Sequence, residues 1–547
     1  LHQDLGTFLR KKSLNSGINR LDTKIPVIYY VVHKLLRDHI MHLSYKTSKY
    51  KGKVYKFYFI AESYREGKKV KKRVIWPIGK LNDVQRDRIS LICKAFSDPD
   101  QVITVMNNIV VQESKPYLDL AVANALWDMW KFSKAFNNHI TNSELSTPLI
   151  AKILTINKCV SPCSHYSIPQ WAKKTALSEV VGCSLKNLND DKIYYELDKI
   201  EHSRKSLENH LFQITCRKDN SSYDFVNYNF FSSYFAGMKC KLSSYEKSKD
   251  SKLHNKQVLL GILVNNKGYP FKWDVYPGDT AADVKTLVGN VDACKERFRL
   301  KNITLVFDHG IVSDDNLEYI AENGLKYISV LDKDQIPDIE GIDLSVFTGI
   351  SFDNFKERLS KQEFTCYDES LYFKDLGLTG KQRYILGFNP VLFRDERKCR
   401  NEKIADNEIL DGICVFISNH IESSDTHFLF SGEKIIKAYR DKAKIEDAFK
   451  HIKSFLKIRS FYVNLDEHVR AVYSICVPAY FLNKDLAERR KKIDGVDYLN
   501  SKNLYEPFRS CHYVTLKDKP SGGKKSKTVE LTLEQESLLR QLQIKTK

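Results

Sequence analysis

The residues of this chain best placed to do chemistry are two aspartates in predicted strands, Asp224 and Asp308. Asp308 follows the apolar run 303–307, which predicts a buried strand with a carboxylate at its carboxyl end. A carboxylate in such a place is costly unless it is paired or binds a metal ion. Asp224 lies in the predicted strand 223–230, among apolar and aromatic neighbours. Taken alone, each aspartate is better explained as a turn or capping residue.

A third acidic residue, Glu446, lies on the predicted amphipathic helix 433–456 together with Tyr439, Lys442 and Lys453. At roughly 100° per residue these four side chains fall within about 60° of one another, so they share one stripe. A solvated helix face with a Lys442–Glu446 pair predicts the same pattern. That alternative stays open, because the other side of the helix carries the apolar residues Ala438, Ile445, Phe449, Ile452 and Leu456.

Three carboxylates of this kind suit catalysis with two metal ions. Carboxylate oxygens are ligands that Mg²⁺ accepts, and two such ions about 3.5–4 Å apart activate a nucleophile and stabilise a leaving oxygen at a phosphodiester. We therefore predict that the three acidic residues are both catalytic and metal-binding, with two Mg²⁺ ions or with Mn²⁺ as a substitute. The tyrosine and the two lysines of the same helix would then contact DNA phosphates.

The elements that must position these residues form an α/β pattern between residues 216 and 331. The predicted strands are 223–230, 258–264, 269–276, 303–307 and 327–331, with helices starting near 281 and over 314–323. Three strands joined by hairpins, then strand, helix and strand, predict a mixed sheet covered by helices.

Composition and periodicity divide the chain into six segments. They are a basic β-rich unit (1–95), a helical region expected to bind DNA (96–215), the first part of the α/β core (216–331), a β-rich insertion (332–430), the second part of the core with Glu446 (431–490) and a C-terminal tail (491–547). In the first segment, the predicted hairpin 54–75 is rich in Lys and Arg. It suits a solvated face or a contact with the DNA backbone equally well.

The charge balance favours a polyanionic partner. Lys and Arg number 87 against 68 Asp and Glu, a net charge of +19, and nucleic acid is the commonest partner of such a chain. No apolar run approaches the ~18 residues of a membrane-spanning helix. The 12 cysteines include no Cys-x-x-Cys pair, which favours reduced thiols in the cytoplasm over a zinc site.

With these motifs in place, the chain resembles the DDE transposases of bacterial insertion sequences, in the branch with a β-rich insertion before the final Glu. Residues 223–225 resemble the first-Asp strand, 261–283 the hairpin that follows it, and 305–310 the second-Asp motif. The most specific feature is the spacing Tyr439-x2-Lys442-x3-Glu446-x6-Lys453, which resembles the family's Tyr-x2-Arg-x3-Glu-x6-Lys signature.

The resemblance implies an RNase H-like catalytic core, interrupted by the insertion, plus a small N-terminal β unit and a helical DNA-binding region. It implies metal-dependent nicking at the transposon end, followed by attack of the freed 3′-OH on DNA. The implied partners are double-stranded DNA, as terminal inverted repeats and target, and a second copy of the chain. Tyr439, Lys442, Lys453 and His309 would contact DNA, in a bacterial cytoplasmic, nucleoid-associated protein without membrane contact.

Three positions depart from the family's pattern. Lys442 stands where Arg is usual and lacks its bidentate fork, His309 replaces a common Arg, and Asn227 stands near a frequent Thr. Two alternatives therefore stay open: a decayed or repurposed DNA-binding derivative, and an RNase H-like nuclease that cuts without joining. A tyrosine recombinase is set aside, because none of the 15 His is followed by Arg at His-x-x-Arg spacing.

Overall fold

The computed structural model describes two compact units of the chain. The described residues are 40–66, 69–97, 106–136, 145–219, 224–234, 239–245, 256–279, 284–336, 342–400, 410–420, 430–442, 446, 450–452, 463, 465–499, 501–520 and 522–546. One unit comprises residues 1–114 and 514–527, and the other comprises 115–513 and 528–547.

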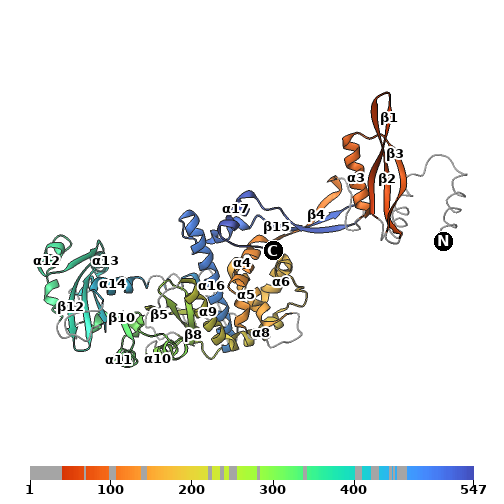
Figure 1. Cartoon of the computed structure of the whole chain (residues 1–547). Helices are drawn as coiled ribbons and strands as arrows, with labels where there is room; N and C mark the ends of the chain where they lie inside the picture. Colours follow the sequence, from red (N-terminus) through yellow and green to blue (C-terminus); the bar gives the residue numbers. More distant parts are fainter. Residues whose placement is uncertain are drawn as a thin grey trace. The chain divides into compact units, whose positions relative to one another are not determined.

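The first unit contains an antiparallel sheet of three strands with a helix beside it (Figure 1). Its elements are β1 (Ile40–Tyr50), β2 (Lys53–Glu66), β3 (Lys69–Gly79) and α3 (Asp83–Ser97). Lys51 and Gly52 join β1 to β2 with φ values of 46° and 75°, the positive angles of a tight hairpin turn. The predicted β-rich hairpin is confirmed as β2 and β3, whereas β1 was not predicted.

A separate sheet of three strands has the order β16-β15-β4. Its strands are β4 (Ile109–Pro116), β15 (His512–Asp518) and β16 (Lys524–Thr528). The prediction that 96–215 is helical is wrong at β4, where the β-branched pair Val110-Val111 favours an extended chain. The segment 491–547 was predicted as a tail, yet it supplies two strands and the short helix α17 (Leu533–Gln541).

Helices form one layer of the second unit. They are α4 (Leu118–Met129), α5 (Thr147–Val160), α6 (Ile168–Lys174), α7 (Leu177–Val181), α8 (Asp190–His202), α9 (Arg204–Asp219) and α16 (Asp466–Asp494). Their apolar faces share one core with Trp127, Tyr473 and Tyr480 among its fully buried side chains. Trp127 and Trp130 donate hydrogen bonds to Ser133 and Asp485 through their indole N–H groups.

The second unit also holds the sheet that carries the predicted site. Five of its strands are β5 (Phe225–Tyr234), β7 (Lys256–Asn265), β8 (Pro270–Pro277), β9 (Thr304–Val306) and β10 (Lys326–Val330). They lie in the order β8-β7-β5-β9-β10, with β7 antiparallel to β5 and β8, and with β5, β9 and β10 mutually parallel. This is the RNase H-like arrangement, so the predicted fold class is confirmed. The two-residue strand β6 (Ser244–Tyr245) also pairs with β7.

The predicted insertion extends this same sheet. It contains α12 (Phe355–Lys361), β11 (Thr365–Asp368), β12 (Leu371–Thr379), β13 (Gln382–Phe388), α13 (Pro390–Arg400) and β14 (Ile413–Ser418). Strand β14 pairs antiparallel with β10 at one edge and with β13 at the other, which gives a sheet of ten strands. The insertion is therefore continuous with the core by backbone hydrogen bonds, and α14 (Gly432–Arg440) follows it.

Different helices pack against the two faces of the sheet. Val226, Tyr228, Leu305 and Phe307 belong to one apolar cluster, which also takes in Leu287 of α10 (Val284–Asp292) and Leu317 of α11 (Asp314–Glu322). Val306, Ile328 and Phe416 belong to another cluster with Ile435 and Ile436 of α14, and Phe225 packs against it. Successive residues of a strand point to opposite faces, and these clusters follow that alternation.

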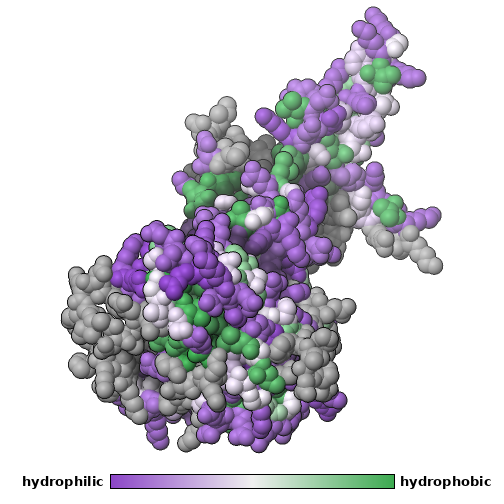
Figure 2. All heavy atoms as spheres, turned by 90° about the vertical axis from the view of Figure 1, so that its left-hand side faces the viewer, coloured by the Kyte–Doolittle hydropathy of each residue, from purple (hydrophilic) through white to green (hydrophobic). Residues whose placement is uncertain are grey.

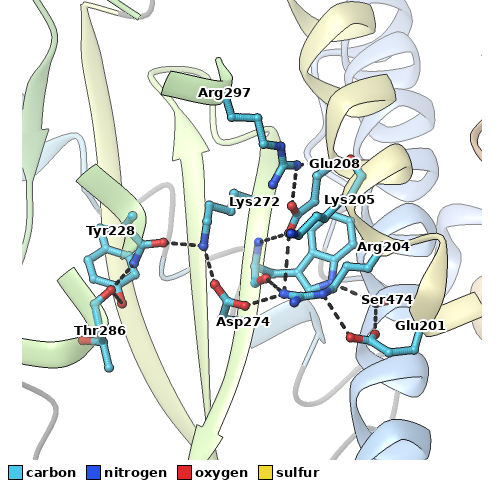
Figure 3. A network of polar contacts seen from close by, with 12 residues as sticks. Glu201, Arg204, Lys205, Glu208, Tyr228, Lys272, Asp274, Thr286, Arg297 and Ser474 are labelled. Carbon is cyan, nitrogen blue, oxygen red and sulfur yellow. Dashed lines mark hydrogen bonds and ion pairs between the residues drawn. The ribbon is translucent and has the colours of Figure 1, made fainter. Parts of the chain in front are cut away.

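A network of charged side chains joins the helical layer to strand β8 (Figure 3). Asp274 accepts hydrogen bonds from Arg204 of α9 and from Lys272. Buried Glu208 pairs with Arg297 at 2.5 Å and accepts from the backbone N–H of Trp273 at 3.2 Å. The network fixes α9 against the hairpin strands, and with them one side of the sheet.

Glu201 of α8 lies at the edge of this network. Its raised pKa predicts that the folding stability depends on pH near neutrality. Burial raises its pKa to about 7, although Arg204, 3.1 Å away, and Arg470 oppose the shift. A carboxyl whose pKa is raised by folding destabilises the folded state as the pH rises from its ordinary pKa near 4.5 to about 7. This contribution lowers stability by about 1.4 kcal/mol per pH unit in that window.

The variant Glu201→Gln is expected to lack this loss, so its stability relative to the natural protein should increase between pH 5 and pH 8. Urea unfolding at both pH values measures the difference. Glu318→Gln, at an exposed position of α11, is the control and should follow the natural protein. An equal pH response of Glu201→Gln and the natural protein would contradict the assignment.

Among the residues that Figure 2 colours by hydropathy, hydrophilic ones predominate on the face drawn, and hydrophobic ones form smaller patches. Within the described part of the chain, no helix is both long enough and apolar enough to cross a membrane. The cysteines described there are all free thiols.

Candidate active site

Asp308 lies directly after the central strand β9, as predicted. The backbone stays extended through it, with φ −87° and ψ 165°, before a short 3₁₀ turn at His309–Ile311. Phe307, one residue earlier, packs in the cluster under α11. The alternation therefore turns Asp308 toward the opposite face, where α14 lies, and its side chain is 35% exposed.

Two residues of the predicted signature reach Asp308 from α14 and the turn after it. The hydroxyl of Tyr439 donates to Oδ1 of Asp308 at 3.0 Å, and Nζ of Lys442 lies 2.9 Å from Oδ2. Tyr439 is held by edge-on packing against Phe416, with ring centroids 5.5 Å apart. The signature thus brings both residues to the predicted carboxylate, with Tyr439 lying 131 residues away in sequence.

The electrostatics of this group follow from its burial and its partners. Burial alone raises the pKa of Asp308, but hydrogen bonds from Lys442 and Tyr439 and the charge of Lys442 outweigh it, and the pKa is lowered. Burial and then the charge of Asp308 raise the pKa of Tyr439 well above its usual value, with a smaller contribution from Glu446. Asp308 is therefore an anion and Tyr439 a proton donor throughout the neutral range.

The prediction of one continuous helix over 433–456 is wrong. Helix α14 ends at Arg440, and Asp441 and Lys442 form a turn in which the N–H of Lys442 donates to the carbonyl of Tyr439. Glu446 is helical again and exposed, and its N–H donates to the carbonyl of Lys442 at 3.4 Å. Glu446 thus lies one helical turn beyond Lys442, and its charge acts on Tyr439.

Asp224 lies elsewhere. Strand β5 begins at Phe225, so Asp224 precedes the strand, is exposed, and offers its backbone carbonyl to the N–H of Thr304 at 2.7 Å. Thr304 opens β9 and stands four residues before Asp308, a distance of about 13 Å along an extended chain. The structure therefore does not bring Asp224 to Asp308. In the described part of the chain, no three His, Cys, Asp or Glu side chains are grouped closely enough to hold a metal ion.

Of the two remaining predicted residues, only His309 belongs to the described part of the chain. His309 is half exposed and its Nδ1 lies 3.4 Å from Oδ1 of Asp308, so it borders the same carboxylate. Lys453 lies outside the described residues. One residue that the sequence noted only as a departure, Asn227, lies on the strand next to β9 and is buried. Its burial distinguishes Asn227 from exposed Asp224, and the sequence alone does not indicate that burial.

Comparisons with known proteins agree with this geometry. Residues 43–101 match the IS1634 family transposase N-terminal domain, and residues 239–482 match the transposase DDE domain. The second match contains Asp308 and the whole signature, and it begins after strand β5. No curated protein matches the chain.

Two solved structures are similar to parts of the chain. A piggyBac transposase synaptic complex with hairpin DNA is 10% identical, with a TM-score of 0.36, and the match covers 73% of this chain and 83% of that one. A Mos1 transposase paired-end complex with the left transposon end is 10% identical, with a TM-score of 0.15 and coverages of 45% and 71%. The two family matches together cover more than half of the sequence, and the chain belongs to the DDE transposases of insertion sequences.

Proposed function

We propose that this transposase cuts the DNA ends of its own insertion sequence and joins them to target DNA, with a divalent metal ion bound at Asp308. The observation that carries the proposal is the placement of Asp308 at the end of a central strand, in contact with two residues of the family's signature. Ligands of open α/β sheets gather at such strand ends.

The residues around Asp308 fit a hard divalent cation. Asp308 is ionised and partly exposed, and exposed Glu446 lies within electrostatic reach of Tyr439, which itself hydrogen-bonds Asp308. Carboxylate oxygens of this kind suit Mg²⁺, and Mn²⁺ as its substitute. Asp308 and Glu446 would hold the metal, which supplies a Lewis acid for phosphodiester chemistry. Asp224 as a third ligand stays a prediction from the sequence.

The neighbouring side chains position the carboxylate and the DNA. Tyr439 donates to Asp308 and so fixes the orientation of its carboxyl group. The ammonium of Lys442, 6% exposed, balances the charge of Asp308 and is available to a phosphate when a metal ion takes its place there. His309 and Lys453 are proposed as further phosphate contacts.

We propose DNA as the partner because of the net positive charge of the chain and the exposed cations of the first unit. Strand β3 exposes Lys69, Lys71, Lys72 and Arg73 to solvent. Exposed cations contact phosphates without regard to sequence, which suits a domain that holds a transposon end. We propose terminal inverted repeats and target duplex as the bound DNA, held by a homodimer that pairs two ends.

A second candidate, a decayed or repurposed copy that binds DNA without cutting it, is favoured by one observation: Asp224 does not lie beside Asp308. Incubation of the protein with a duplex that carries the ends flanking its gene separates the two. Nicking at the end with Mg²⁺ or Mn²⁺, and none with EDTA, is the expected result. Specific binding without nicking under every metal condition would reject the enzyme in favour of the binding protein.

A further inference from the structure

Strands β15 and β16 form a hairpin, residues 512–528, whose positive charge the proposed function does not use. Between residues 514 and 527 this C-terminal hairpin holds five lysines and a single acidic residue, Asp518. None of these lysines forms an ion pair with an acidic residue in the described part of the chain. The five are Lys517, Lys519, Lys524, Lys525 and Lys527.

Backbone hydrogen bonds fix the register of the C-terminal hairpin. At its turn, the N–H of Asp518 donates to the carbonyl of Gly523 at 2.9 Å, and Gly522 has a φ of 68°. Three residues further along each strand, the hydroxyls of Thr515 and Ser526 lie 2.9 Å apart. The two strands are therefore paired without a shift between the turn and this contact, and the positions of the lysines are defined.

This register places lysines on both faces of the C-terminal hairpin. Lys517 lies opposite Lys524, on the face where Thr515 and Ser526 meet. Lys525 and Lys527 point to the other face, because successive residues of a strand alternate. A polyanion can therefore be contacted from either side of the ribbon.

The sheet β16-β15-β4 leaves these lysines open to solvent. Strand β16 lies at its edge, and four of the five residues of β16 are exposed. Of the described residues in the three strands, only Asp518 is buried. A sheet of three strands ordinarily buries one apolar face, and this sheet buries neither. Its exposed surface is thus available to a partner.

The chemistry of the lysines selects the partner. Residues 514–527 belong to the same compact unit as β3, whose exposed cations are already proposed to contact DNA. Duplex DNA carries one negative charge per about 1.7 Å of helix axis, and its major groove admits a two-stranded ribbon. Lysine contacts phosphate as a point charge and reads no base by doing so.

We propose that the C-terminal hairpin binds the phosphate backbone of duplex DNA without regard to sequence. The inference rests on the proposed DNA partner and adds a surface that is separate from β3 and from Asp308. The alternative role is protective, because lysines on an edge strand also prevent its pairing with other chains. Removal of the lysines would then cause aggregation and leave the affinity for DNA unchanged.

Fluorescence anisotropy of labelled duplexes with the full chain, in EDTA so that no cleavage intervenes, tests the proposal. The triple variant Lys524→Gln/Lys525→Gln/Lys527→Gln is expected to bind at least about tenfold more weakly at about 0.1 M salt. The slope of log K against log salt concentration should fall in magnitude by about 2–3, since three phosphate contacts are lost. An end duplex and an unrelated duplex of equal length should lose the same factor.

Two further variants separate a phosphate contact from other causes. Lys524→Arg/Lys525→Arg/Lys527→Arg keeps the charges and should bind as the natural protein does. Lys301→Gln/Lys381→Gln/Lys492→Gln removes the same net charge from exposed positions on three separate elements and should also bind normally. Unchanged binding by the hairpin glutamine variant would overturn the proposal. So would equal losses in the two glutamine variants, or a loss that the arginines do not prevent.

The outcome is distinguishable from failure of the proposed function. Binding that depends on the hairpin lysines, in a protein that nicks no DNA end with any metal ion, supports the surface and rejects the transposition activity. Metal-dependent nicking by a protein whose affinity for DNA does not depend on these lysines keeps the activity and rejects the surface.

Discussion

Asp308→Asn is expected to lower the rate of metal-dependent nicking at a transposon end by at least about 10³-fold, which corresponds to about 4 kcal/mol of transition-state stabilisation. The substitution keeps the size of the side chain and both of its heavy-atom positions, but it removes the negative charge. Asp308 is the carboxylate that Tyr439 and Lys442 both contact, so the change removes the anion around which the site is built. Single-turnover cleavage of end DNA measures the effect.

The fold should survive this substitution. Asp308 is 35% exposed, and an asparagine there retains an acceptor for the hydroxyl of Tyr439. Asp315→Asn is the matched control, because Asp315 is exposed in the first turn of α11, which covers the other face of the sheet. It should cleave at the natural rate. Cleavage by Asp308→Asn within about tenfold of that rate would place the active site elsewhere.

The sequence predicted the central strands well, for a physical reason. The runs that became β7 and β9 are almost wholly apolar, and a strand buried on both faces requires that composition. The position of Asp308 after such a run followed directly. The family's signature grouped Tyr439 with Lys442, but their contact with Asp308 was not predicted, because both residues were expected to contact DNA phosphates.

The end of α14 was not predictable from periodicity. Apolar residues continue at helical spacing beyond Arg440, as Ile445 and Ile452 illustrate, so the pattern has no visible break. The turn at Asp441 and Lys442 depends on where the helix meets the sheet, which is a tertiary property. A helical pattern predicts the buried face of a segment more reliably than it predicts the segment's last residue.

The position of Asp224 relative to Asp308 could not be predicted from the sequence, for a different reason. The sequence indicates that it lies near a strand, but its level relative to Asp308 depends on the register between β5 and β9, whose paired residues are 79 apart in sequence (304 − 225). Register is set by long-range packing, and a shift of one residue exchanges the two faces.

The second large effect is expected on stability, at Asp274. This carboxylate lies between the cations of Arg204 and Lys272, and all three side chains are at least three-quarters buried. Burial raises the pKa of Asp274, but the charges of Lys272 and Arg204 outweigh it, so the pKa is lowered. Asp274→Ala leaves two buried cations without their shared anion and is expected to cost about 3–5 kcal/mol.

The pH dependence of this contribution follows from the direction of the shift. Because folding lowers the pKa of Asp274, its contribution is fully present above the ordinary pKa near 4, and it is lost as the pH falls through the lower, folded value. Urea unfolding at pH 7 should therefore show the full difference between the natural protein and Asp274→Ala, and at pH 3 a smaller one. Glu201 contributes in the opposite direction, since its pKa is raised.

Asp279→Ala is the matched control, because Asp279 is exposed just after the same strand. It should change the free energy of unfolding by less than about 0.5 kcal/mol. A cost for Asp274→Ala as small as that of the control would mean that the network in Figure 3 adds no net stability. A large cost would identify the network as the attachment of α9 to β8, and so as a structural support of the sheet that carries Asp308.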